Sequence, residues 1–185
     1  MIHANIKGLE LVFETAKDQF SPREIDPGTL AMLSVVNFEQ AKKVLDLGCG
    51  YGVVGVLAAR IVGPENVVMV DNHPGAVELA RRNCKLNGVE GVEVTLSDGL
   101  AMVTANDFDL ILSNPPYHVD FSTPKRFIEK GFNRLAVGGR FYLVTKRLKW
   151  YRNKLRSIFG GSRVEEIDGY LVFESIKRRA SYATR

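Results

Sequence analysis

The stretch Lys43-Val44-Leu45-Asp46-Leu47-Gly48-Cys49-Gly50-Tyr51-Gly52 decides the fold. Its first five residues are mostly apolar and predict a buried strand, and residues 51–62, which are almost wholly apolar, predict a helix. Glycines at three alternate positions join the two elements. Glycine lets the backbone pass close to a ligand, and the helix that follows begins with free N–H groups. The stretch therefore predicts a strand, a ligand-binding loop and a helix in succession.

The alternation of strand and helix continues toward the C-terminus. A second helix is expected to begin at Pro74 and to end at Asn87-Gly88, and a third to begin at Thr123-Pro124 and to end at Gly138-Gly139. A basic helix is expected at about 149–159. The strands between these helices are expected at 67–71, 92–96, 108–112 and 140–145.

The last two expected strands differ from the others in how they are connected. Residues 163–167 and 170–176 are separated only by Asp168-Gly169. So short a link permits a hairpin and no crossover, and this pair must therefore be antiparallel. The chain is thus expected to have an α/β fold of three layers, with a mostly parallel sheet covered by helices on both faces.

Length and composition indicate a single domain. The chain has 185 residues, of which 45% are hydrophobic, enough for one core over residues 1–185. The longest apolar run, 53–62, contains Arg60 and is too short to cross a bilayer, so a cytoplasmic protein without membrane contact is expected. Cys49 and Cys84 are expected to be free thiols. The histidines have no metal-ligand spacing, and no metal is expected.

Charge is unevenly distributed along the chain. Residues 146–185 hold 11 Lys/Arg and 4 Asp/Glu, whereas residues 1–145 hold 14 Lys/Arg and 17 Asp/Glu. This asymmetry favours a polyanionic partner, nucleic acid, for the C-terminal part, although a cationic tail can also serve solubility alone. The basic stretch 146–154 follows an expected strand; it is either a phosphate-binding rim or a helix with a solvated cationic face.

In a parallel sheet, ligands bind beyond the carboxyl ends of the strands. Asp71-Asn72 ends the second strand of the series, where a carboxylate can accept hydrogen bonds from ribose hydroxyls; the same residues also suit an ordinary helix start. Ser97-Asp98-Gly99 ends the third strand, where a carboxylate can accept from an adenine amino group or simply lie in a surface turn. Val53 stands where a dinucleotide fingerprint requires a third glycine.

Asn114-Pro115-Pro116-Tyr117 follows the fourth strand. Two consecutive prolines continue neither a central strand nor a helix, so the segment is expected to be a stiff turn at the ligand end of the sheet. The Asn114 side-chain carbonyl and the Pro115 carbonyl can accept both hydrogens of an amino group, and Tyr117 offers a ring on which a flat group can stack. This chemistry suits methylation of a planar, conjugated nitrogen.

The chain resembles class I S-adenosylmethionine-dependent methyltransferases. The resemblance lies in four features and in their order along the chain: the loop at 46–52, Asp71, Asp98 and the Asn-Pro-Pro-Tyr turn. The segments 20–29 and 114–118 are similar to the small-domain methyltransferases that include the bacterial 16S ribosomal RNA guanine-N2 enzymes. This resemblance implies a Rossmann-like, seven-stranded sheet with an antiparallel last strand, and S-adenosylmethionine as cofactor. It also implies that residues 1–40 form a segment covering the cofactor and a helix, and that 41–185 form the catalytic core.

The chemistry of the residues and the resemblance together suggest roles for individual positions. The catalytic turn is Asn114, Pro115, Pro116 and Tyr117. The expected cofactor-binding residues are Asp46, Gly48, Cys49, Gly50, Asp71, Asn72, Asp98, Gly99 and Asn114. The expected substrate-binding residues are Tyr117, His118, Lys146, Arg147, Lys149, Trp150 and Arg152.

The leading expectation is methylation of an exocyclic base amine in RNA, with guanine N2 of ribosomal RNA, free or in a ribosomal subunit, ahead of adenine N6. The same turn also suits the glutamine amide of a release factor. A non-catalytic RNA-binding module that keeps the cofactor as a structural ligand is the alternative from another class. Transfer of labelled methyl groups separates these functions.

Overall fold

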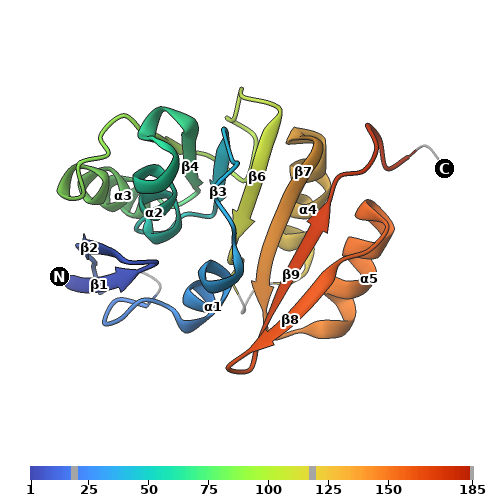
Figure 1. The fold of residues 1–185 in the computed structure, drawn as a ribbon, viewed down its shortest axis with the longest axis horizontal. Coiled ribbons are helices and arrows are strands. Elements are labelled where there is room, and N and C mark those ends of the chain that lie inside the picture. Colours follow the sequence, from blue (N-terminus) through green and yellow to red (C-terminus); the bar gives the residue numbers. More distant parts are fainter. Residues whose placement is uncertain (18–20, 117–119, 184–185) are drawn as a thin grey trace.

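The computed structural model describes residues 1–17, 21–116 and 120–183. Its centre is a seven-stranded sheet in the order β5-β4-β3-β6-β7-β9-β8. The bounds are β3 (Val44–Leu47), β4 (Val67–Asp71), β5 (Glu93–Leu96), β6 (Phe108–Ser113), β7 (Leu135–Thr145), β8 (Arg163–Ile167) and β9 (Tyr170–Ile176). Strands β3 to β7 pair in parallel, whereas β9 pairs antiparallel with both β7 and β8. The predicted sheet, with its reversed end, is confirmed (Figure 1).

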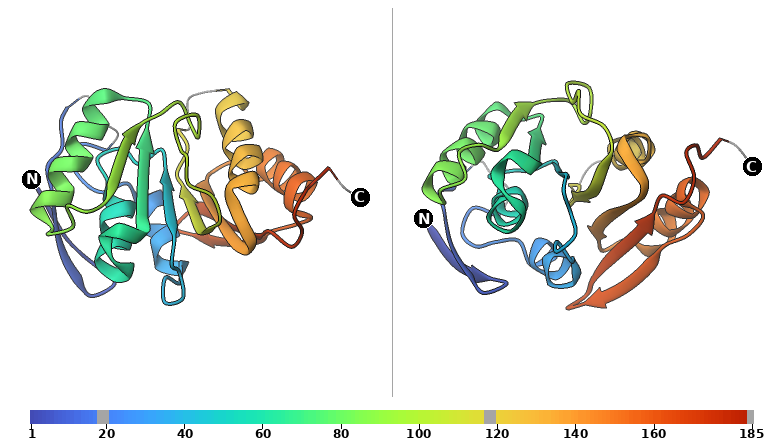
Figure 2. Two further views of the ribbon diagram at one scale, coloured as in Figure 1. Left: turned by 90° about the horizontal axis from the view of Figure 1, so that it is seen from above. Right: turned by 45° about the horizontal axis from the view of Figure 1, so that its top comes forward.

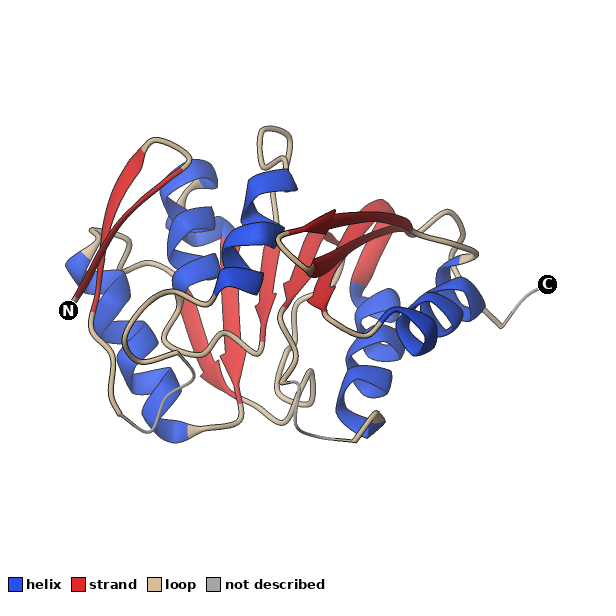
Figure 3. Cartoon of the chain, turned by 90° about the horizontal axis from the view of Figure 1, so that it is seen from below, coloured by secondary structure: helices blue, strands red, loops and turns tan. Residues whose placement is uncertain are grey.

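Helices cover both faces of this sheet (Figure 3). One face packs against α1 (Pro27–Val35), α2 (Val53–Val62) and α3 (Pro74–Leu86), and the other against α4 (Ser122–Arg134) and α5 (Leu148–Phe159). Alternation along the strands supplies both cores: Val44 belongs to the first and Leu45 to the second. A short turn, η1 (Pro64–Asn66), links α2 to β4. The three layers of the predicted α/β fold are therefore present.

None of the helices in the described ranges combines the length and apolarity needed to cross a lipid bilayer. Within those same ranges, His, Cys, Asp and Glu side chains form no group of three or more that could hold a metal ion.

The boundary between α4 and β7 differs from the prediction. Gly138-Gly139 was expected to end a helix, but α4 ends at Arg134 and both glycines lie inside β7. The register with β6 shifts between Phe108 and Leu110. A Cβ atom at Gly139 would lie 2.8 Å from the Phe108 carbonyl oxygen, so glycine permits this close approach of two backbones.

A two-stranded hairpin at the N-terminus was not predicted. It consists of β1 (Ile2–Ile6) and β2 (Leu9–Phe13) and lies beside α2 and α3, far from β8 and β9 (Figures 1 and 2). Lys7 and Gly8 both have positive φ, 53° and 78°, as a two-residue turn of type I′ requires. The inward-facing Leu11 and Phe13 are buried in the core with α2 and α3.

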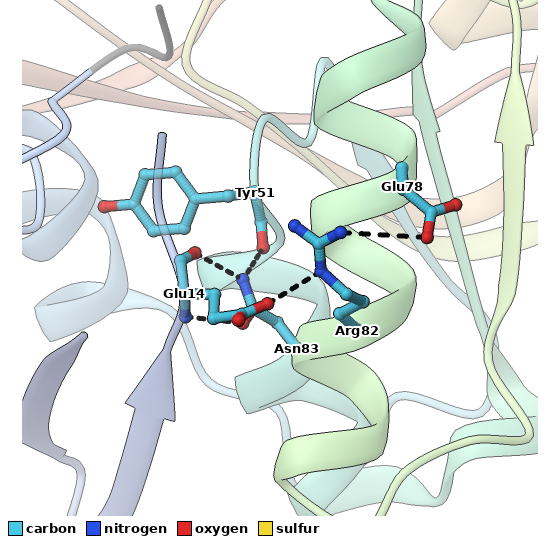
Figure 4. Close-up of polar contacts among 5 residues, drawn as sticks. All are labelled: Glu14, Tyr51, Glu78, Arg82 and Asn83. Atoms are coloured by element: carbon cyan, nitrogen blue, oxygen red, sulfur yellow. Dashed lines mark hydrogen bonds and ion pairs between the residues drawn. The ribbon is translucent and has the colours of Figure 1, made fainter. Parts of the chain in front are cut away.

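Two asparagines, one in α3 and one that caps its C-terminus, tie the hairpin to the rest of the molecule. Asn87 accepts from the Val12 N–H (3.0 Å) and donates to the Val12 carbonyl (2.8 Å). Asn83 makes the same pair with Glu14, at 2.7 and 2.9 Å, and donates at 2.7 Å to the Tyr51 carbonyl. Arg82 lies beside them, paired with Glu14 and Glu78 (Figure 4). The asparagines thus bind alternate residues as a neighbouring strand would.

Candidate active site

A pocket of about 310 Å³ opens at the carboxyl ends of β3, β4, β5 and β6. This is the edge of the sheet where ligands bind in open α/β folds. All nine predicted cofactor positions line it: Asp46, Gly48, Cys49, Gly50, Asp71, Asn72, Asp98, Gly99 and Asn114. Pro116 also lines it. Four separate loops of the sequence therefore meet in one cavity.

The glycine loop after β3 is held to β4 and keeps one side open. The N–H groups of Gly48 and Cys49 both donate to the Val70 carbonyl at 2.9 Å. Gly50 has φ +54°, and a Cβ atom built there would meet nothing within 4 Å. Gly52 has φ +100°, and its Cβ would lie 2.8 Å from Met69 Cε. The backbone can therefore approach a ligand at Gly50, whereas Gly52 lets α2 begin tight against β4.

Asp71 fixes the loop from the end of β4. Its Oδ2 accepts the Gly50 N–H at 2.8 Å and its Oδ1 accepts the His73 N–H at 2.9 Å. Each carboxylate oxygen can accept a further hydrogen bond. Asn72 is exposed at the pocket wall. It does not cap α3, because the cap is His73, whose Nδ1 accepts the Ala76 N–H at 3.3 Å.

Asp98 has a partner that the sequence did not suggest. Arg126 of α4 donates from both terminal nitrogens to the two Asp98 oxygens, at 3.0 and 3.1 Å. Both side chains are exposed, so the pair contributes little to stability. Arg126 and Phe127 line the pocket beside Gly99. The carboxylate expected at the adenine is thus shared with an arginine at the pocket rim.

Negative charge dominates the pocket wall. Among the described lining residues, the acidic side chains are Asp26, Asp46, Asp71 and Asp98, against the single arginine, Arg126. Asp46 is buried, and burial raises its pKa to about 7; the N–H of Gly55, 2.8 Å away, opposes this rise and the nearby Asp71 adds to it. A ligand with positive charge and hydroxyl donors fits this wall. S-adenosylmethionine, with its sulfonium, ammonium and ribose hydroxyls, is such a ligand.

The raised pKa of Asp46 predicts how stability depends on pH. Because the folded-state pKa is about 7 and the ordinary value is 3.8, the folded state penalises the charged form. The folded state therefore binds the Asp46 proton more tightly than the unfolded state does. The stabilisation from this protonation is complete below pH 4 and is lost as pH rises to about 7. Between pH 5 and 8 the free energy of unfolding should fall by about 3 kcal/mol more in the wild type than in Asp46→Asn. Denaturant unfolding at both pH values measures this, and parallel pH profiles would contradict it.

The link between Asn83 and Tyr51 predicts that the hairpin and the glycine loop share an anchor. Asn83→Ala should lower the free energy of unfolding by about 3 kcal/mol, because three backbone groups, two partly buried and one buried, lose their partner. It should also weaken S-adenosylmethionine binding, since Tyr51 belongs to the glycine loop. Denaturant unfolding and calorimetric titration measure the two effects.

Asn87→Ala is the matched control for this prediction, because Asn87 contacts the hairpin but not Tyr51. It should destabilise the fold without changing cofactor affinity. An equal loss of affinity in both variants would exclude a specific role of the Tyr51 contact.

The turn after β6 directs one amide into the pocket. Ser113 anchors the end of β6 by donating to the Leu47 carbonyl at 2.9 Å. Asn114 Nδ2 then donates to Asp26 Oδ2 at 2.8 Å and to Thr29 Oγ1 at 2.9 Å. Pro115 is buried and Pro116 exposed. Tyr117 and His118, predicted to contact substrate, lie outside the described residues, as does Phe20.

The N-terminal segment reaches the same pocket. Ser21, Ile25, Asp26 and Thr29 line it, and the Tyr51 hydroxyl donates to the Ser21 carbonyl at 3.4 Å. The segment was expected to cover the cofactor. Its contact with Asn114 was not anticipated, although the sequence offers a sign of the local structure: Asp26-Pro27 is a cap followed by proline at the first helical position.

The predicted substrate-binding residues of the basic stretch lie outside the pocket lining. Lys146, Arg147, Lys149 and Arg152 are exposed. The first two directly precede α5 and the other two lie in its first two turns, at the sheet edge where β7 ends, the same edge as the pocket. Trp150 is half-buried and stacks on Phe121 at 4.4 Å between ring centroids. One face of its ring is therefore occupied, and a base could reach only the other.

Comparison with known proteins agrees with this geometry. The model of the family described as "Methyltransferase small domain" matches residues 10–174. The small subunit ribosomal RNA methyltransferase C of Haemophilus influenzae strain PittGG is 35% identical over 85% of this chain and 48% of its own length. The large subunit ribosomal RNA methyltransferase G of Streptomyces avermitilis is 32% identical over 86% of this chain and 43% of its own.

A solved structure is similar over almost the whole chain. The 16S ribosomal RNA guanine-N2 methyltransferase of Thermus thermophilus, in complex with AdoMet and guanosine, matches with a TM-score of 0.86 and 28% identity over 96% of this chain and 50% of that one. The chain spans about half the length of the curated relatives that it matches. The family match, the sheet order and the pocket agree: the chain belongs to the methyltransferase small domain family, whose cofactor is S-adenosylmethionine.

Proposed function

We propose that this chain transfers a methyl group from S-adenosylmethionine to an exocyclic amine of an RNA base, namely guanine N2 of ribosomal RNA. The observation that carries the proposal is the Asn114 amide, held in the pocket wall by two hydrogen bonds that its nitrogen donates. The similarity to the Thermus thermophilus enzyme, whose structure contains AdoMet and guanosine, supports guanine.

In this proposal each group of pocket residues binds a different part of the cofactor. The open backbone at Gly48–Gly50 lies along the methionine part, and Asp46, in the same pocket wall, accepts the Gly55 N–H of α2 at 2.8 Å. Asp71 accepts from the ribose hydroxyls through the lone pairs that Gly50 and His73 leave available. Asp98 accepts from the adenine amino group while Arg126 holds its position. Asn72 and Gly99 also line the pocket.

The turn residues act on the amine. When bound, the cofactor supplies a methyl group on a sulfonium, which is already a good leaving group. Asn114 and the Pro115 carbonyl accept the two hydrogens of the amine, drawing its lone pair out of conjugation with the ring. The same oxygens stabilise the positive charge that develops on nitrogen, and the proton passes afterward to water. Holding the amine in line supplies roughly 7–11 kcal/mol of the barrier by proximity and orientation.

The basic start of α5 gives the chain a surface for phosphates. Lys149 and Arg152 are exposed beside Arg147, whose guanidinium lies 5.2 Å from the centroid of the Phe121 ring. Phe121 directly precedes α4 and follows the segment that contains Tyr117. A strand of RNA lying across α5 would therefore bring its bases toward the turn, and an unpaired base costs least to place there.

The experiment is transfer of labelled methyl groups from S-adenosylmethionine to total RNA, to purified ribosomal subunits and to a release factor in parallel. Nucleoside digestion then identifies the product. N2-methylguanosine in ribosomal RNA is the expected result. If N6-methyladenosine is found instead, the substrate base is adenine and not guanine. Methylation of protein alone would exclude an RNA substrate. Binding of S-adenosylmethionine without methyl transfer would indicate a binding module.

A further inference from the structure

The amide of Asn114 is oriented by residues that lie far from it in the sequence. Its nitrogen has two hydrogens, and these go to Asp26 Oδ2 at 2.8 Å and Thr29 Oγ1 at 2.9 Å. A carboxylate oxygen accepts and does not donate, so the nitrogen end of the amide must face Asp26. The carbonyl oxygen consequently points to the opposite side of the Asn114 side chain.

Asp26 and Thr29 are themselves fixed by helix α1. Asp26 caps the helix, and its Oδ2 accepts the Thr29 N–H at 2.9 Å. Both side chains are buried, with 7% and 8% of their surface exposed. The same carboxylate oxygen thus binds the helix backbone and the Asn114 amide, so the position of α1 determines the position of the amide.

We propose that Asp26 and Thr29 are positioning residues for Asn114: they lock the amide so that its carbonyl oxygen faces the amine to be methylated. The inference rests on the proposed function, because it assigns Asn114 the role of accepting from that amine. The negative charge of Asp26 adds to the effect, since a hydrogen bond to a carboxylate polarises the amide and strengthens its oxygen as an acceptor. An amide free to rotate would turn its NH2 group toward the substrate amine about half of the time. In that orientation its hydrogens would repel the hydrogens of the amine.

Thr29→Val tests this role with little change of shape. The variant removes the hydroxyl that accepts from Asn114 and keeps a side chain of similar volume, and Thr29→Ser restores the hydroxyl. Turnover at saturating RNA should fall about 10- to 100-fold in Thr29→Val, with the Michaelis constant for RNA and the affinity for S-adenosylmethionine nearly unchanged. Thr29→Ser should return most of the turnover, and Thr29→Ala should repeat the loss if the valine variant folds poorly.

A double-variant cycle with Asn114→Ala separates positioning from general damage. If Thr29 acts through Asn114, Thr29→Val lowers turnover when Asn114 is present. The same substitution causes no further loss of turnover in a chain that already carries Asn114→Ala. Additive losses would overturn the inference. So would full turnover in Thr29→Val.

Nuclear magnetic resonance of the Asn114 side-chain amide gives a readout that needs no activity. Its signals are those lost in Asn114→Ala, and Thr29→Val should shift one of the two protons and speed its exchange with water. If the wild type methylates RNA but Thr29→Val changes neither these signals nor the turnover, the positioning role fails and the proposed function stands. If the signals respond but the wild type transfers no methyl group to RNA, the contact is real and the proposed function fails together with the role in it.

Discussion

Asn114→Ala is expected to lower the turnover of methyl transfer to RNA about 100- to 1000-fold. The alanine removes the carbonyl oxygen that, in the proposed mechanism, accepts from the amine and stabilises the charge that develops on it. Cofactor affinity should change by only a few-fold, because the glycine loop, Asp71 and Asp98 keep their contacts. Single-turnover transfer of labelled methyl groups and calorimetric titration with S-adenosylmethionine measure the two quantities.

The matched control for this prediction is Asn66→Ala. Asn66 ends the short η1 turn just before β4, at the opposite edge of the sheet from the pocket, and donates to the Val62 carbonyl at 2.7 Å. The control should transfer methyl groups at the wild-type rate. A variant Asn114→Ala that is as active as this control would overturn the proposed mechanism.

Charge reversal on α5 is expected to weaken RNA binding on the order of 100-fold at low salt. Lys149→Glu with Arg152→Glu replaces two exposed cations by anions near the start of α5, which begins at the same edge of the sheet as the pocket. Each lost phosphate contact should also reduce the slope of log affinity against log salt by about 1. Binding titrations with ribosomal RNA at several salt concentrations measure both effects, and cofactor affinity should stay unchanged.

Lys42→Glu with Arg60→Glu makes the same change of net charge elsewhere. Both residues are exposed; Lys42 precedes β3, and Arg60 lies in the last turn of α2, so they lie toward the opposite edge of the sheet. This pair should lose much less affinity than the α5 pair. Equal losses would show that net charge, and not the surface of α5, governs RNA binding.

The central elements could be predicted from the sequence because their signals are local. The strand at 44–47, its glycine loop and the apolar helix carry their own periodicity and turn chemistry, and the structure has them in this order. The hairpin of β1 and β2 has the same kind of signal, alternating apolar residues around Lys7-Gly8, and it could have been found. The start of β7 could not, because the register shift that admits Gly138-Gly139 to the strand depends on its neighbour β6.

The pocket was predicted more fully than the contacts within it. A rule about strand ends places Asp46, Asp71 and Asp98 together without any knowledge of distances. The pairing of Asp98 with Arg126 and the stacking of Trp150 on Phe121 join residues 28 and 29 positions apart, and nothing near either partner signals them. Side-chain partners of this kind are decided by the packing of α4 and α5, which the sequence pattern gives only as amphipathic helices.

The contact between Asn114 and helix α1 has a consequence for molecules that are only partly folded. Asp26 and Thr29 are 88 and 85 residues away from Asn114 along the chain, so bringing them together closes a long loop at a cost in conformational entropy. A chain with its central sheet formed but its first thirty residues undocked would hold the turn without an oriented amide. If the proposed positioning role holds, a molecule in which helix α1 has not docked transfers methyl groups slowly even when its cofactor pocket is formed.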